Sequence, residues 1–230
     1  FTVMVCVSDC GSTNMVLWRN ILNIFCIPAL IRSFFADTQH LLKLIRNWLL
    51  GTGFESKVTK TPILQLLEYQ TEISSIFKIT KEHLECQGPG RQRVSLASQL
   101  LSHTDAAALT FNKKEDGDDF ENLGSVIEII NDWFDVMNSY VPLASTPTKS
   151  GYGQTTACAV QNVALDKMYD MMRTMRCIGK NKILSFQEGI LMSINALKQL
   201  LEEVKQEYNV SYILTHKLNG VTIRTHSMYE

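Results

Sequence analysis

The first part of the chain alternates short continuous apolar runs with amphipathic stretches. Val3 to Asp9 reads Val-Met-Val-Cys-Val-Ser-Asp, and residues 31–36 read Ile-Arg-Ser-Phe-Phe-Ala directly before Asp37. Apolar runs of this length are typical of buried parallel strands. Apolar residues recur at helical spacing from Val16 to Ile24 and again from Leu41 to Leu50. The pattern therefore predicts a βαβα segment over the first 50 or so residues.

Helical periodicity dominates the remaining chain. The expected helices cover residues 62–69, 72–81, 94–102 with a continuation through the following alanines, 124–140, 155–175 and 185–208. The last of these has apolar residues at near-ideal helical spacing. Polar or glycine-rich connections separate the helices, as at residues 87–90, 112–119 and 145–153. We therefore expect a mixed α/β protein that is mostly α-helical.

Composition and charge exclude several classes of protein. The formal net charge of -1 gives no overall electrostatic footprint for nucleic acid. The six cysteines form no CxxC pair, so a zinc site is not expected. The most apolar window, residues 15–31, is interrupted by Arg19 and Pro28 and is too broken for a membrane span. We expect a soluble intracellular protein with reduced thiols.

Acidic residues follow both predicted strands, at Asp9 and Asp37. Parallel strands present their carboxyl ends, and often their chemistry, at one edge of a sheet. The two carboxylates could share Mg²⁺, which favours a few carboxylates together with water and phosphate oxygens. Alternatively, Asp37 or Thr38 caps the next helix and His40 packs in its first turn. The sequence leaves both interpretations open.

A second group of candidate residues lies at 131–135, which reads Asn-Asp-Trp-Phe-Asp. On a helix, Asn131 and Asp135 share a face with Phe134. A carboxylate can accept two hydrogen bonds from the N1 and N2 edge of guanine while an aromatic ring packs on the base. The alternative is that Trp133 and Phe134 belong to the core and the acids are solvated. No GxxxxGK pattern is present, which excludes an ordinary P-loop NTPase.

Several blocks of sequence together resemble the transposases of P elements and their THAP-domain relatives. They keep the order of that family over nearly the whole chain, at residues 5–11, 35–47, 76–79, 93–102, 131–138, 173–175, 186–190 and 212–215. The resemblance implies an RNase H-like fold interrupted by a large helical, GTP-binding insertion domain. Residues 1–52 and 209–230 would belong to the RNase H-like domain and residues 53–208 to the insertion domain.

The resemblance also implies an activity and its residues. Relatives cut and join DNA with Mg²⁺, and GTP acts as a cofactor in their assembly on DNA. Asp9 matches the second of three catalytic acids and would be a metal ligand. Asp135 would read guanine and Phe134 would pack on it. The positions that match nucleotide-contacting residues are Lys78, Val94, Ser102, Asn131, Phe134 and Asp135.

The chain also departs from the family pattern. The first catalytic acid, the zinc-coordinating DNA-binding module and the oligomerising segment would all precede Phe1, so we expect a fragment. Val221 and Arg224 stand where acids are expected near the other end. We therefore expect a nuclear, transposase-like fragment that binds GTP but is inactive in DNA cleavage and joining. Two alternatives remain: a domesticated helical protein-interaction module without nucleotide binding, and an incomplete gene model of an active transposase.

Overall fold

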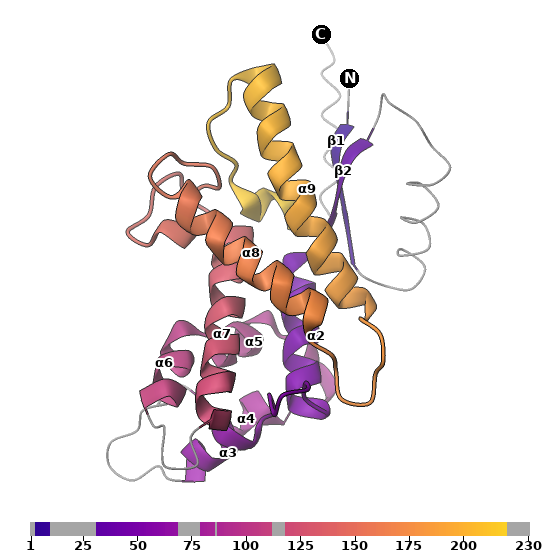
Figure 1. Ribbon diagram of the computed structural model, residues 1–230, viewed down its shortest axis with the longest axis vertical. Coiled ribbons are helices and arrows are strands. Elements are labelled where there is room, and N and C mark those ends of the chain that lie inside the picture. The colour runs from indigo at the N-terminus through magenta and orange to yellow at the C-terminus, as the bar shows by residue number, and fades with distance from the viewer. Residues whose placement is uncertain (1–2, 10–30, 69–78, 86, 112–117, 220–230) are drawn as a thin grey trace.

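The computed structural model describes residues 3–9, 31–68, 79–85, 87–111 and 118–219, which form a small parallel sheet and a larger helical body (Figure 1). The described elements are, in order, β1 (Val3–Ser8), β2 (Ile31–Ala36), α2 (Thr38–Gly51), α3 (Thr61–Glu68), α4 (Lys81–Leu84), the 3-10 helix η1 (Gly88–Gln92), α5 (Val94–Leu100), α6 (His103–Phe111), α7 (Asp118–Met137), η2 (Pro147–Lys149), α8 (Cys158–Thr174), α9 (Ser185–Tyr208) and η3 (Thr215–Leu218). This content confirms a mixed α/β protein that is mostly helical.

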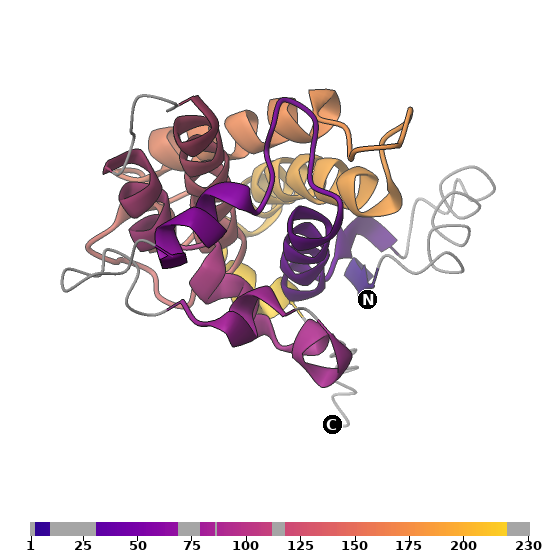
Figure 2. The same ribbon diagram turned by 90° about the horizontal axis from the view of Figure 1, so that it is seen from below.

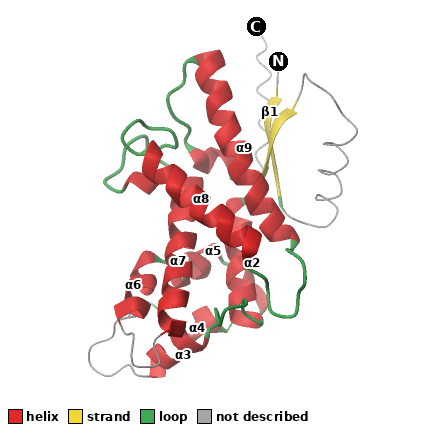
Figure 3. Cartoon of the chain, viewed as in Figure 1, coloured by secondary structure: helices red, strands yellow, loops and turns green. Residues whose placement is uncertain are grey.

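The sheet consists of two parallel strands in the described part of the chain. β1 pairs with β2 in a register that runs from Val3 opposite Ile31 to Ser8 opposite Ala36. Helix α9 lies beside the strands (Figure 3), and the backbone N–H of Ala36 donates a hydrogen bond to Ser193 Oγ in α9 at 2.9 Å. Both predicted strands are confirmed, whereas the predicted helix at 16–24 lies outside the described residues.

Helix α7 runs through the middle of the helical body, with α6 and α8 packed against it. Its inward face is fully buried, and Ile127 and Trp133 are each 0% exposed. Gly124 allows α6 to approach closely, since a Cβ atom there would lie 2.8 Å from Thr110 Oγ1 and 3.1 Å from the carbonyl oxygen of Ala106. Seen from below, the two strands lie to one side of this helical body (Figure 2).

Three helices differ from their predicted extents. Residues 72–78 of the helix expected at 72–81 lie outside the described residues, and α4 begins only at Lys81. The helix expected to run from 94 through the alanines is divided into α5 and α6, because Ser102 begins a new helix. The Asp105 backbone N–H donates to Ser102 Oγ at 3.3 Å, and that hydroxyl donates to the Asp105 carboxylate at 3.0 Å. The Ser102 side chain thereby caps the first turn of α6, which favours a helix start. Helix α7 begins at Asp118, six residues before the predicted start at Gly124.

The end of the described chain returns to the end of α7. Ile213 forms an antiparallel bridge with Tyr152, and buried Thr215 lies two residues further on. Thr215 Oγ1 donates to the Val136 carbonyl oxygen at 2.5 Å and accepts from the Ser139 backbone N–H at 2.9 Å. These buried hydrogen bonds hold the C-terminal segment against α7. Within the described ranges, no helix is long and apolar enough to cross a membrane.

Candidate functional site

Asp9 and Asp37 both follow strands at the carboxyl edge of the sheet. The backbone N–H of Asp37 donates to the Ser8 carbonyl oxygen at 2.9 Å, so the two strand ends are neighbours. The Asp37 carboxylate accepts a hydrogen bond from the Gln39 backbone N–H at 3.1 Å and thereby caps α2. Asp9 is exposed. In the described ranges, no three His, Cys, Asp or Glu side chains are grouped to hold a metal ion.

Asn131 connects Asp135 to the turn between α5 and α6. Its Nδ2 donates to Asp135 Oδ2 at 3.3 Å, and its Oδ1 accepts from the His103 backbone N–H at 3.2 Å. The two side chains lie one helical turn apart on α7, as their spacing predicts. The structure therefore brings Asn131 and Asp135 together and places the Ser102–His103 turn beside them.

Ser102 and Phe134 have structural contacts of their own. The Ser102 hydroxyl is hydrogen-bonded to the Asp105 carboxylate within the helix cap. Phe134 is half-buried and packs against the hydrophobic core, while its neighbour Trp133 is completely buried. The expectation of a core role is thus correct for Trp133. Phe134 is only half-buried and lies three positions after Asn131, within one helical turn of it.

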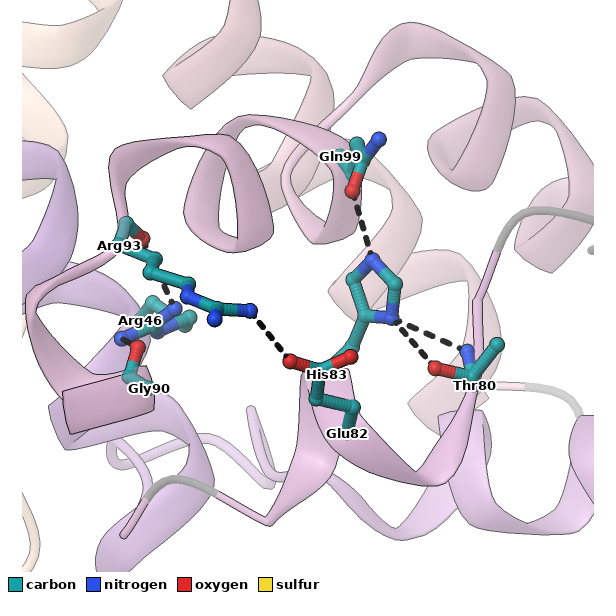
Figure 4. A network of polar contacts seen from close by, with 7 residues as sticks. All are labelled: Arg46, Thr80, Glu82, His83, Gly90, Arg93 and Gln99. Carbon is teal, nitrogen blue, oxygen red and sulfur yellow. Dashed lines mark hydrogen bonds and ion pairs between the residues drawn. The ribbon is translucent and has the colours of Figure 1, made fainter. Parts of the chain in front are cut away.

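Val94 begins α5 beside a corner that a buried arginine holds together (Figure 4). Arg46 in α2 is 1% exposed. Its guanidinium donates to the carbonyl oxygens of Gly90 at 3.2 Å, Arg91 at 2.8 Å and Arg93 at 3.3 Å. A buried charge is costly unless it is hydrogen-bonded, and these carbonyl oxygens satisfy its two terminal nitrogens, while Nε has no partner among the described residues. The contacts fix η1 and the start of α5 against α2.

Lys78 lies outside the described residues. The chain resumes at Ile79, which is 4% exposed and leads into α4. His83 ties α4 to α5: its Nδ1 accepts from the Thr80 backbone N–H at 3.1 Å, and its Nε2 lies 2.8 Å from Gln99 Oε1 (Figure 4). Because Nδ1 is an acceptor here, Nε2 carries the proton and donates to Gln99.

Burial sets the electrostatics of the α7 face. The Asp135 side chain is 18% exposed. Burial raises the pKa of its carboxyl above the usual value, and the negative charge of Asp132 adds to this. The ammonium of Lys149, the hydrogen bond from Asn131 and the charge of His103 act in the opposite direction on that pKa. The carboxylate is thus partly desolvated, which strengthens any hydrogen bond that it accepts.

Lys149 is a candidate site residue that the sequence pattern did not single out. Its Nζ lies 3.8 Å from Asp135 Oδ2, although 14 positions separate the two residues. A pocket of about 330 Å³ opens next to this pair and is lined by both side chains. Ligand pockets commonly have volumes of about 300 Å³ or more. Lys149 was missed because it falls in a polar connection with no local signature.

Three comparisons with known proteins show what this chain is similar to. A family model described as a TNP-like, GTP-binding insertion domain matches residues 39–150. The transposable element P transposase of Drosophila melanogaster is 31% identical over 235 residues, which cover 95% of this chain and 31% of that protein. A solved Drosophila P element transposase strand transfer complex has a TM-score of 0.83 at 30% identity, over 95% of this chain and 52% of that chain.

The chain therefore spans about a third of the curated relative, and its resemblance extends through both the sheet and the helical body. The matched residues 39–150 include the described nucleotide candidates from Val94 to Asp135, together with Lys149, whereas Asp9 lies before them. The chain is thus similar to P element transposases over 95% of its length, and its residues 39–150 match the TNP-like, GTP-binding insertion domain.

Proposed function

We propose that this chain binds GTP on the face of α7 that carries Asn131 and Asp135. The observation that carries the proposal is the partly buried Asp135 carboxylate at the side of a 330 Å³ pocket, within the matched insertion domain. A carboxylate accepts hydrogen bonds and cannot donate them when ionised. It is therefore complementary to the N1–H and N2–H₂ groups of guanine and opposed to the N1 acceptor of adenine.

Neighbouring residues have supporting roles in the proposal. Asn131 orients the carboxylate through its hydrogen bond to Oδ2. Phe134 offers the accessible part of its ring for apolar contact with the nucleotide. Ser102 and Val94, at the starts of α6 and α5, complete the set of candidate nucleotide-contacting positions. Lys78 would supply positive charge near the phosphates.

Equilibrium titration of the full chain with a fluorescent GTP analogue tests the proposal, with ATP as competitor and Asp135→Ala as the variant. We expect GTP to compete at least about 10-fold better than ATP. If adenine bound instead of guanine, the partly buried Asp135 carboxylate would be left without a hydrogen-bond donor, and such unpaired polar groups are costly. Asp135→Ala should remove this preference. Equal, weak competition by both nucleotides would contradict the proposal and favour a protein-interaction module without nucleotide binding.

We further propose that Asp9 belongs to an RNase H-like catalytic domain made of residues 1–52 and 209–230, with 53–208 as the insertion domain. The strand-end position of Asp9 suits a Mg²⁺ ligand in DNA cleavage. Val221 and Arg224 stand where family members have acids, so we propose that the chain by itself does not cut or join DNA. DNA binding, homo-oligomer formation and a nuclear location follow from the relatives as parts of the same proposal.

Mixing the chain with supercoiled plasmid and Mg²⁺ tests the catalytic part. We expect no nicked or linear product above that of an Asp9→Asn control. Nicking that Asp9→Asn abolishes would contradict the proposed inactivity while supporting the role of Asp9.

A further inference from the structure

The pocket beside Asp135 has both a hydrogen-bond acceptor and a hydrogen-bond donor in its lining. Asp135 and Lys149 both line it, and Lys149 Nζ lies 3.8 Å from Asp135 Oδ2. The Asn131 amide and the Lys149 ammonium both approach Oδ2. The carboxylate and the ammonium are close enough to meet one edge of the same planar ligand. Together they offer carboxylate oxygens as acceptors and an ammonium as a donor, with Nζ and Oδ2 3.8 Å apart.

The loop that carries Lys149 is fixed by a buried glutamine. Gln161 in α8 is 0% exposed. Its Nε2 donates to the carbonyl oxygens of Pro147 at 3.1 Å and Ser150 at 2.9 Å, and its Oε1 accepts from the Gly153 backbone N–H at 3.0 Å. Three backbone groups on both sides of Lys149 are thereby held by one side chain. The backbone of Lys149 is set in place, while its side chain remains 58% exposed and able to move toward a ligand.

An aromatic wall lies on another side of the pocket. Tyr140 lines it and stacks on His216 with ring centroids 4.4 Å apart and planes inclined by 24°. His216 Nδ1 lies 2.9 Å from the Ser139 carbonyl oxygen, so this nitrogen carries a proton and donates. The pairing holds Tyr140 in place although the residue is 58% exposed. A preordered, accessible ring suits the flat face of a base.

From this arrangement we infer that Lys149 is a specificity-determining residue that donates a hydrogen bond to O6 of guanine, while Asp135 accepts from N1–H and N2–H₂. The inference rests on the proposed binding of GTP and deepens it. The Watson–Crick edge of guanine runs donor, donor, acceptor, which matches two carboxylate oxygens followed by an ammonium. Adenine has an amino donor where guanine has O6, so Lys149 and the adenine amino group would be two donors in opposition.

Nucleotide analogues that change one edge atom at a time test the inference. Inosine triphosphate lacks the N2 amine that Asp135 would bind. The 6-thio analogue of GTP keeps both N–H donors but replaces O6 by sulfur, a weak acceptor. Each is titrated against the full chain and against Lys149→Met, Lys149→Arg and, as a matched control on an exposed lysine, Lys182→Met.

In the unmodified chain we expect GTP to bind about 10-fold more tightly than the 6-thio analogue. The analogue weakens the hydrogen bond from the charged Lys149 ammonium, because sulfur replaces O6 as its acceptor. Lys149→Met should lose this discrimination, binding both equally, while it still prefers GTP over inosine triphosphate. Lys149→Arg should keep both preferences, because its guanidinium remains a charged donor. Lys182→Met should bind all nucleotides as the unmodified chain does.

Other outcomes would overturn the inference. If Lys149→Met weakens GTP and its 6-thio analogue by the same factor, Lys149 acts on the phosphates or on the fold and does not read O6. If the unmodified chain prefers GTP to ATP but does not distinguish the 6-thio analogue, the proposed function stands and the role of Lys149 is refuted. If GTP does not bind at all, the proposed function itself fails.

Discussion

Replacing Asp135 by asparagine should change the base that the chain prefers from guanine to xanthine. The substitution keeps the shape of the side chain and exchanges one acceptor oxygen for an amide donor. That donor would face the N2 amine of guanine, so one favourable contact becomes a clash of two donors. Xanthine has a carbonyl oxygen at C2 in place of the amine. The asparagine amide would donate to this oxygen and accept from N1–H.

The expected size of the change follows from the burial of Asp135. A hydrogen bond to a charged group contributes about 1.5–3 kcal/mol, and more when it is shielded from water. The Asp135 side chain is 18% exposed, so solvent screens the contact only in part. We therefore expect Asp135→Asn to weaken GTP binding by about 10- to 150-fold, at 1.4 kcal/mol for each factor of ten. Binding of xanthosine triphosphate should improve by a similar factor.

Competition calorimetry with GTP and xanthosine triphosphate measures both changes in one variant.

Urea unfolding of Asp135→Asn, compared with the unmodified chain, shows whether the substitution has disturbed the fold. Burial raises the pKa of Asp135, so its ionised form is disfavoured in the folded state, and this cost is present at neutral pH, above the folded pKa. Asp135→Asn should therefore unfold at the same or a higher urea concentration at neutral pH. An unchanged affinity for GTP, or a loss of GTP without any gain for xanthosine triphosphate, would refute the reasoning.

Three further perturbations should have measurable effects. GTP affinity should fall as the pH drops through the pKa of Asp135. Because that pKa is raised, the fall should begin above the value of about 3.9 for an ordinary Asp. Titrations at a series of pH values, with Asp135→Asn as the non-titrating control, would check this. Arg46→Met removes the donor from three carbonyl oxygens and should cost about 2–4 kcal/mol in urea unfolding; an unchanged midpoint would contradict this. Gln161→Leu should cost a similar amount, about 2–4 kcal/mol, and should also weaken GTP binding through Lys149, whereas normal affinity would show that the loop does not need the glutamine.

Elements with a strong local pattern could be predicted from the sequence. Helix α9 spans Ser185–Tyr208 as expected, because its apolar residues recur at regular helical spacing and bury one face. The strand Ile31–Ala36 was likewise predicted from its apolar run. The break between α5 and α6 was missed because the alanines continue the helical pattern. What ends α5 there is the competing cap formed by Ser102 and Asp105.

The candidate site was predictable only where its residues lie on one element. Asn131 and Asp135 share a face of α7 by spacing alone. Lys149 and Tyr140 reach the same pocket through packing between distant segments, and no local pattern reports such packing. His216 comes from the end of the described chain and meets Tyr140 only after the chain has returned to α7. The sequence therefore singled out Asp135, the residue that we propose reads guanine, but not the other residues that line its pocket.

A crystal structure of the chain with GTP tests guanine recognition at Asp135 most directly. We predict that guanine N1 and N2 lie about 2.7–3.2 Å from the two Asp135 carboxylate oxygens, with the base in the pocket beside Tyr140. Guanine bound at another place, or turned so that its N1–N2 edge faces solvent, would contradict this prediction.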